Sequence, residues 1–139
     1  FTSFISWTMQ LEHNGLGKIV ARRGGRPAGA HTYLKHLAFS RLYLDNFAHL
    51  SASWPTQGEK TAQTGLHFGA DDFGSTMMEE NVVSASGAVD CKKTIEEIRR
   101  QIRAAGFEPV QRDSRYRRRV GAEAAGQEGL PDAASSIGR

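Results

Sequence analysis

Hydrophobic and polar residues alternate weakly at the start of the chain, in a stretch rich in aromatic and β-branched residues, Phe1-Thr2-Ser3-Phe4-Ile5-Ser6-Trp7. This pattern predicts a buried strand over residues 2–6. From His31 to Asp45 the pattern changes to the spacing of an amphipathic helix, whose apolar positions are Leu34, Leu37, Ala38 and Leu42. A helix is therefore expected there, ending near Asn46.

Two further strands are expected at residues 48–53 and 68–72, with a helix over residues 57–67 between them. Thr94 and Glu97 have the spacing of a capping box, which predicts the start of another helix. This helix has one apolar stripe, formed by Ile95, Ile98, Ile102 and Ala105.

Glycine ends or interrupts the regular pattern at several places. Gly106 is placed to end the last helix in the left-handed conformation, and residues 107–112 could then form a final extended segment. Residues 9–30 are punctuated by glycine and proline, which predicts a long loop, and such loops are commonly functional or disordered. After Tyr116 the chain has almost nothing to bury. We therefore expect one folded domain over residues 1–116 and a disordered tail over residues 117–139.

Strands that alternate with helices in this order are typical of a parallel α/β protein with right-handed crossovers. Three such units cannot close a barrel, so they would form the C-terminal portion of a (β/α)8 TIM-type barrel. The chain begins with Phe1 rather than Met and enters a strand at once, which suggests that a preceding part is missing.

Polar and aromatic residues follow all three expected strands, where barrel enzymes carry their functional groups. Two of these stretches resemble each other, because Ser6-Trp7-Thr8-Met9-Gln10 and Ser53-Trp54-Pro55-Thr56-Gln57 both contain Thr and end in Gln. Tryptophan can stack on a nucleobase or pack in the core, and the sequence leaves both open. Gln and Thr can bond to sugar hydroxyls. The residues expected to share one mouth are Trp7, Thr8, Gln10, Trp54, Thr56, Gln57, Asp71, Asp72, Ser75 and Thr76.

The acidic pairs Asp71-Asp72 and Glu79-Glu80 allow a metal site, an acid–base pair or simple solvation. Neighbouring residues of a strand point to opposite faces, so at most one of Asp71 and Asp72 should face the mouth. The five histidines have no metal-ligand spacing, and no metal site is expected. A single cysteine, Cys91, rules out an internal disulfide and a cysteine-rich metal site made by this chain alone.

Composition indicates a soluble protein, with 39% hydrophobic and 24% charged residues and no apolar stretch long enough to cross a bilayer. A cytoplasmic location and no membrane partner are expected. The net charge of +3 raises the question of nucleic acid. Much of the positive charge lies in Arg112, Arg115, Arg117, Arg118 and Arg119 at the end of the predicted domain, which favours a solvated tail over a nucleic-acid site.

Several ordered segments resemble one group of radical S-adenosylmethionine enzymes, most closely the dehypoxanthine futalosine cyclases of menaquinone biosynthesis. The most specific segment runs from Gly69 to Gly87 and contains Met77-Met78-Glu79-Glu80-Asn81-Val82-Val83. The other matching segments are residues 4–10, 33–46, 52–58, 105–107 and 111–113. Two positions depart from the usual pattern, since Asp71 replaces Asn and Ser6 replaces Pro. Either change could alter local hydrogen bonding.

The resemblance implies a barrel enzyme that cleaves S-adenosylmethionine with a [4Fe-4S] cluster and an external electron donor. The deoxyadenosyl radical would abstract hydrogen from the ribose of a nucleoside-derived substrate, and the sugar radical would add to its benzoate ring. This chain lacks the cluster cysteines, so it should be inactive by itself. Asp72 and Glu79 are the implied candidates for a base, and substrate contact is implied for Trp7, Thr8, Gln10, Trp54, Thr56, Gln57, Asp71 and Thr76.

The sequence leaves three alternative functions open. Aminofutalosine synthase and the deazaflavin-coenzyme synthase share much of the pattern, although the Met-Met-Glu-Glu-Asn-Val-Val stretch favours the cyclase. A small basic RNA-binding module would use the arginine cluster instead. A catalytically inactive structural remnant is the third reading.

Overall fold

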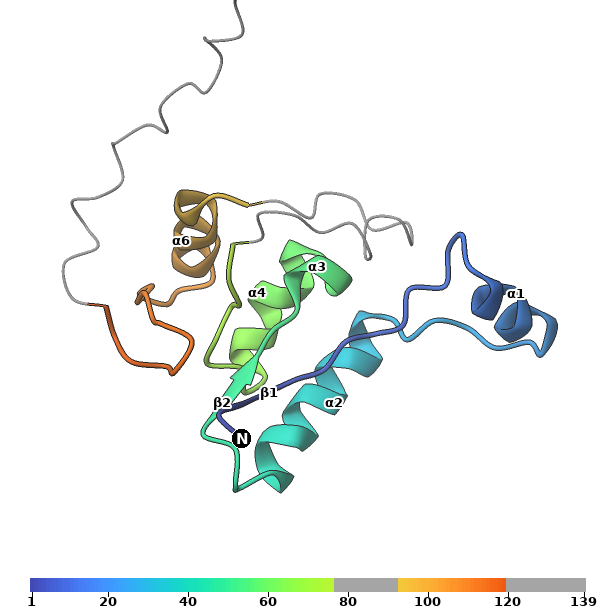
Figure 1. Cartoon of the computed structure of the whole chain (residues 1–139), viewed down its shortest axis with the longest axis horizontal. Helices are drawn as coiled ribbons and strands as arrows, with labels where there is room; N and C mark the ends of the chain where they lie inside the picture. Colours follow the sequence, from blue (N-terminus) through green and yellow to red (C-terminus); the bar gives the residue numbers. More distant parts are fainter. Residues whose placement is uncertain (77–92, 120–139) are drawn as a thin grey trace, which may run out of the picture. The chain divides into compact units, whose positions relative to one another are not determined.

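The computed structural model describes residues 1–76 and 93–119. The chain divides into two compact units, residues 1–109 and residues 110–139. The helices and the strand pair found among the described residues all lie in the first unit (Figure 1).

The strands of the first unit are parallel. β1 (Ser3–Ile5) pairs with β2 (His49–Ser51), with Phe4 opposite Leu50 and Ile5 opposite Ser51. The strand expected at residues 68–72 is reduced to a single parallel bridge, in which Asp72 pairs with Ser51 on the other side of β2. We call this third parallel stretch the third segment. The amide of Asp71 donates to Leu50 O at 3.0 Å, and the amide of Ala52 donates to Asp72 O at 2.8 Å. Helices and parallel strands in this order confirm the α/β class.

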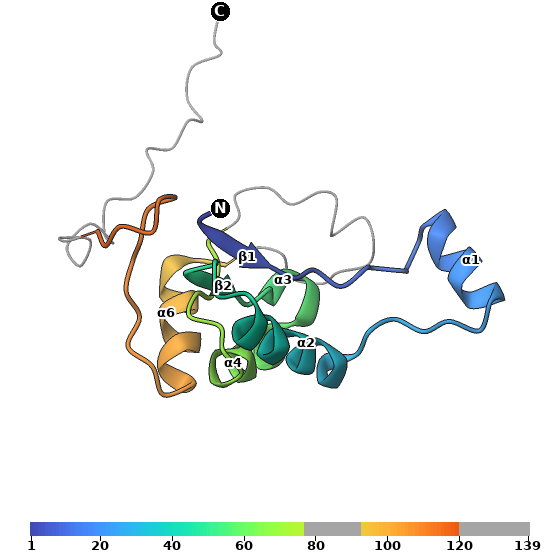
Figure 2. The same ribbon diagram turned by 90° about the horizontal axis from the view of Figure 1, so that it is seen from below.

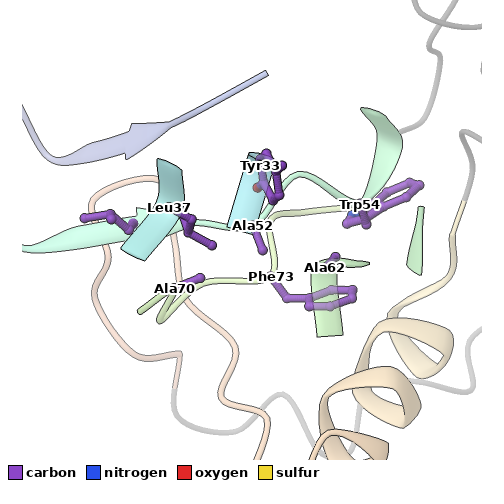
Figure 3. Close-up of a cluster of buried hydrophobic side chains, with 8 residues drawn as sticks. Tyr33, Leu37, Ala52, Trp54, Ala62, Ala70 and Phe73 are labelled. Atoms are coloured by element: carbon purple, nitrogen blue, oxygen red, sulfur yellow. The ribbon is translucent and has the colours of Figure 1, made fainter. Parts of the chain in front are cut away.

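Two helices cover one side of these strands. α2 (Ala30–Tyr43) confirms the helix expected from His31 to Asp45, and α4 (Glu59–His67) follows β2. The core between them is built around Leu37 and Leu50, which are fully buried. The other buried hydrophobic residues are Tyr33, Ala52, Trp54, Ala62, Ala70 and Phe73 (Figure 3).

The helix expected over residues 57–67 is divided at Gly58. Trp54–Gln57 forms the short helix α3, which has a proline in its first turn, and α4 begins at Glu59. Gly58 has a φ of 78°, a left-handed value that only glycine adopts at little cost. α3 and α4 are therefore two separate helices joined at Gly58.

A helix lies within residues 9–30, so the prediction of a continuous loop there is wrong. α1 (Gly15–Arg22) starts at Asn14, whose Oδ1 accepts a hydrogen bond from the Gly17 amide at 2.8 Å. Gly17 is required by packing, because a Cβ there would lie 1.8 Å from Leu11 O. In both views α1 stands apart from the helices that pack on the strands (Figures 1 and 2).

The last helix, α6 (Ile95–Ala104), begins and ends as expected. Thr94 and Glu97 form the capping box, and Gly106 has a φ of 87°. α6 packs on α4, where the Gln63 amide donates to Gln101 O at 2.9 Å and the Gln101 amide donates to Glu59 at 2.7 Å. Ile98 and Ile102 contact the core.

The described part of the second unit, residues 110–119, is a tight turn closed by an antiparallel bridge between Arg112 and Arg118. The Asp113 carboxylate accepts hydrogen bonds from the backbone amides of Arg115 and Arg117. The extended segment expected at residues 107–112 forms a bridge only at Arg112. Most of the predicted tail lies outside the described residues.

Candidate functional site

The carboxyl ends of three parallel segments lie side by side, because β2 pairs with β1 on one side and with Asp72 on the other. The residues that follow each segment therefore leave the sheet at the same edge, as in α/β folds that carry their sites there. Thr8 and Gln10 follow β1, and Thr56 and Gln57 follow β2.

These four residues line one hollow with a volume of about 290 Å³. Its remaining lining comes from the two chain segments that flank α1, namely Met9, Leu11, Glu12, Pro27, Ala28 and Ala30. The hollow thus lies between the ends of two strands and the chain segments on either side of α1. Its polar groups are hydroxyls, amides and one carboxylate, a set that suits a ligand rich in hydroxyl and amide groups.

Hydrogen bonds between the two similar stretches hold this lining together. Gln57 Nε2 donates to Thr8 Oγ1, and Gln10 Nε2 donates to Thr56 O at 3.2 Å. Thr56 is fixed in turn, because its hydroxyl lies 2.7 Å from Ser53 Oγ. Each Gln side chain therefore reaches across to the other strand end and is held there by a hydrogen bond.

The two tryptophans lie in different environments. Trp7 is 63% exposed at the end of β1, whereas Trp54 is 2% exposed and belongs to the core. The Lys93 ammonium lies 5.2 Å from the centre of the Trp54 ring, so one face of that ring is already covered. For Trp54 the structure favours core packing over stacking on a ligand, while Trp7 presents an open surface.

The Asp71 side chain has a structural role, because three neighbouring groups bind its carboxylate. Its carboxylate lies 2.7 Å from Arg41 Nη2 and 2.6 Å from His49 Nδ1, and it accepts a bond of 2.7 Å from the Leu50 amide. Partial burial acts to raise the pKa of Asp71, but the bonds from His49 and Leu50 and the charge of Arg41 outweigh it and hold that pKa below its ordinary value. Asp71 thus ties the end of α2 to the start of β2 and is not brought to the hollow.

Asp72 is buried, at 8% exposure, and has different partners from Asp71. Its Oδ2 accepts a hydrogen bond of 2.5 Å from Ser51 Oγ, and Ser51 Oγ lies 3.3 Å from Ser3 Oγ. The two carboxylates were expected to point apart, and their different partners agree with this. Asp72 does not line the hollow itself.

The remaining predicted residues lie at or beyond the end of the third segment. Thr76 and Ser75 are exposed. Glu79 and Glu80 lie outside the described residues. Ser3 and Ser51, together with the lining residues that flank α1, were not predicted as site residues. The position of Ser3 and Ser51 within the two expected strands was the available signal for these two residues.

Comparison with known proteins adds a direct assignment. A family model described as the CofH/MqnC C-terminal region matches residues 1–125. The chain belongs to this family.

Three relatives show which activities the CofH/MqnC family includes. Proteins named cyclic dehypoxanthine futalosine synthase from Halalkalibacterium halodurans and Streptomyces coelicolor are 43% and 44% identical over 116 residues, or 84% of this chain. A 5-amino-6-(D-ribitylamino)uracil–L-tyrosine 4-hydroxyphenyl transferase from Methanopyrus kandleri is 41% identical over 120 residues, again 84% of the chain. The family is thus one of enzymes. The chain spans 30%, 27% and 31% of the lengths of these relatives, respectively.

The side chains of this CofH/MqnC-family chain do not fit an iron–sulfur cluster. It has one cysteine, and a cluster is held by several thiolates. Among residues 1–76 and 93–119, no three His, Cys, Asp or Glu side chains are grouped to hold a metal ion. None of the helices in the same ranges has the length and apolar character needed to cross a bilayer.

The arginine cluster has partners within its own turn. The guanidinium of Arg117 lies 2.7 Å from the Asp113 carboxylate, and the guanidinium of Arg112 lies 4.4 Å from the centre of the Tyr116 ring. These contacts give two of the five arginines a local role. They offer no particular support to a nucleic-acid site.

Proposed function

We propose that this chain forms the substrate-binding side of an enzyme that makes cyclic dehypoxanthine futalosine, within the closing part of a (β/α)8 barrel. The observation that carries the proposal is the meeting of Thr8 and Gln10 with Thr56 and Gln57 around one hollow. These side chains belong to the ends of two neighbouring parallel strands, where a barrel enzyme binds its substrate. The names of two relatives point to the same reaction.

In this proposal the amides and hydroxyls of the hollow bind the sugar and amide-like groups of dehypoxanthine futalosine. Trp7 offers an exposed aromatic face beside them, and Thr76 and Glu79 are further candidates for contact. Asp72 is the base that accepts the proton lost when the benzoate ring regains its aromaticity. Asp71 and Trp54 are not assigned contacts, because Arg41 and His49 engage the first and the core encloses the second.

S-adenosylmethionine and a [4Fe-4S] cluster would supply the initial radical, and an external donor would supply the electron. The donors present here do not fit a cluster, so its ligands would have to come from outside these 139 residues. The residues of this chain bind and orient the substrate and take up one proton.

The second candidate function is the reaction of the hydroxyphenyl transferase, to which this chain is 41% identical. The two candidates differ in substrate. Incubating the complete protein separately with dehypoxanthine futalosine and with 5-amino-6-(D-ribitylamino)uracil plus tyrosine, followed by mass spectrometry, distinguishes them. The proposal expects the cyclic product from the first substrate and no transfer product from the second.

The hollow is tested by Gln57→Ala in the complete protein. Loss of one uncharged hydrogen-bonding group should raise KM roughly 3- to 10-fold. Gln111→Ala, a change of the same type outside the hollow, is the matched control and should leave KM unchanged. Equal KM values for both variants and the wild type would remove the hollow from the proposal.

A further inference from the structure

A row of polar side chains crosses all three parallel segments. It begins at Ser3 in β1, continues through Ser51 in β2 and ends at Asp72 in the third segment, with oxygen–oxygen distances of 3.3 Å and 2.5 Å. Ser51 is 5% exposed and Asp72 is 8% exposed. Buried polar groups cost free energy unless they are hydrogen-bonded, whereas buried apolar side chains stabilise the fold directly. A row of bonded polar groups in the interior therefore needs an explanation other than stability.

The row lies apart from the core that stabilises the fold. Phe4 and Leu50, which are opposite each other in the register, both belong to the apolar cluster shared with α2 and α4. Ser51 follows Leu50, and neighbouring residues of a strand point to opposite faces. The hydroxyls and the carboxylate therefore occupy the other side of the strands from the helices.

The direction of the two hydrogen bonds in this row follows from the single proton that each serine hydroxyl can donate. Ser51 donates its one hydroxyl proton to Asp72 Oδ2, so its oxygen can only accept from Ser3. The order is Ser3 to Ser51 to Asp72. The distance of 2.5 Å is at the short end of the range for hydrogen bonds between oxygen atoms. Ser51 thus donates to one oxygen of the Asp72 carboxylate while it accepts from Ser3.

We propose that Ser51 is a positioning residue that orients the Asp72 carboxylate for proton transfer, and that Ser3 supports Ser51 by donating a hydrogen bond to Ser51 Oγ. This inference rests on the proposed function, in which Asp72 accepts the ring proton. The sugar radical adds to a ring carbon and forms a carbon–carbon bond. Asp72 then takes the proton from that carbon, and one electron leaves to a one-electron oxidant supplied by the complete enzyme. The products are the aromatic ring, a carboxylic acid and the reduced acceptor.

The test uses the complete protein and substrate deuterated at the ring carbon that loses its proton. In Ser51→Ala, kcat should fall roughly 10- to 100-fold with little change in KM, because orientation of the base is lost and binding is not. Proton removal should become slower than the other steps, so the deuterium isotope effect on product formation should rise above that of the wild type. Ser51→Thr keeps the hydroxyl and should restore both values toward those of the wild type.

Two further variants make the result decisive. Ser3→Ala should cause a smaller loss of kcat in the same direction, which keeps the test valid if Ser51→Ala does not fold. Ser40→Ala changes a buried serine of α2 and should leave kcat and the isotope effect unchanged. A merely structural role for Ser51 would lower the active fraction and leave the isotope effect of the remaining enzyme unchanged.

The outcomes separate this inference from the function on which it rests. A wild-type protein that forms no cyclic product would contradict the proposed function. An active wild type whose Asp72→Asn variant turns over normally would contradict the assignment of Asp72 as the base. The third outcome concerns the positioning role alone. If the wild type is active and depends on Asp72, but Ser51→Ala and Ser3→Ala both keep the wild-type kcat and isotope effect, the positioning role is contradicted.

Discussion

Asp71 and Asp72 are neighbours in the chain, but their carboxylates have different partners and therefore different roles. Asp71 is engaged by Arg41 and His49 at a partly exposed position, while Asp72 is buried and bonded to Ser51. The acidic pair and the opposite directions of its members could be predicted from the sequence. The partners could not, because Arg41 and His49 are 30 and 22 residues away from Asp71.

The Asp71 contacts predict a pH-dependent stability. Because the folded state holds the pKa of Asp71 below its ordinary value, the carboxylate contributes stability at pH values above about 4, and the contribution is lost as the pH falls through the folded pKa. Asp71→Asn should lower the free energy of unfolding by no more than about 1 kcal/mol at pH 7, since the side chain is 42% exposed. Thermal unfolding of the complete protein between pH 7 and 2 should show this difference shrinking in acid. A difference that stays constant across the range would contradict the role of Asp71.

Ser6 offers a second prediction at this scale. Among the described residues, its hydroxyl is the buried side-chain group for which no hydrogen-bond partner is found. Ser6→Ala should therefore stabilise the protein by up to about 1 kcal/mol. Ser53→Ala is the matched control, because its hydroxyl lies 2.7 Å from Thr56 Oγ1, and it should cost about 1 kcal/mol. Chemical denaturation of both variants checks the contrast, and equal losses of stability would show that Ser6 is bonded.

At the scale of elements, helices with strong local signals were predicted well. Thr94, Glu97 and Gly106 determine both ends of α6 through interactions within a few residues. α1 was missed because its glycines resemble those of a loop, although Gly17 is there to accommodate Leu11 O. The division at Gly58 was also missed, since the φ of a glycine depends on where the following helix packs.

The cap of α6 predicts a measurable local effect. Thr94→Ala removes the hydroxyl that accepts from the Glu97 amide at 3.2 Å and should cost about 1 kcal/mol. Thr64→Ala in α4 is the control, because that hydroxyl bonds to Lys60 O, which the helix already uses, and the change should be close to neutral. Amide hydrogen exchange should speed up across residues 95–104 in the first variant only. Unchanged exchange in Thr94→Ala would contradict the importance of the cap.

The candidate site was also predictable in part at the element scale. Residues that follow the expected strands were predicted to share one mouth, and the structure places four of them, Thr8, Gln10, Thr56 and Gln57, around one hollow. The stretches are not equivalent, because α3 carries Trp54 into the core while Trp7 stays exposed. The contribution of residues flanking α1 depends on the path of the chain between residues 11 and 27, which no local pattern indicates.

At the scale of the molecule, the first unit leaves apolar surface uncovered. Phe39, Leu42 and Tyr43 are 65%, 83% and 85% exposed on one face of α2, and among the described residues β1 pairs with a strand on one side only. Surfaces of this kind associate with other protein. The isolated 139-residue chain should therefore self-associate, as measured by size-exclusion chromatography with light scattering.

A matched pair of variants tests this prediction. Leu42→Lys should shift the isolated chain toward monomer, because it places a charge in the apolar face of α2. Thr64→Lys adds the same charge at an exposed position of α4 and should leave the association unchanged. A wild-type chain that is monomeric and unfolds cooperatively would contradict the expectation.

The central claim is that the ends of neighbouring parallel strands in this chain form one substrate site. A crystal structure of the complete protein with dehypoxanthine futalosine tests it most directly. We expect the substrate to contact the Gln10 and Gln57 amides in the hollow, with its benzoate ring directed toward Asp72. A substrate bound away from these residues, with the hollow filled only by water, would contradict the account.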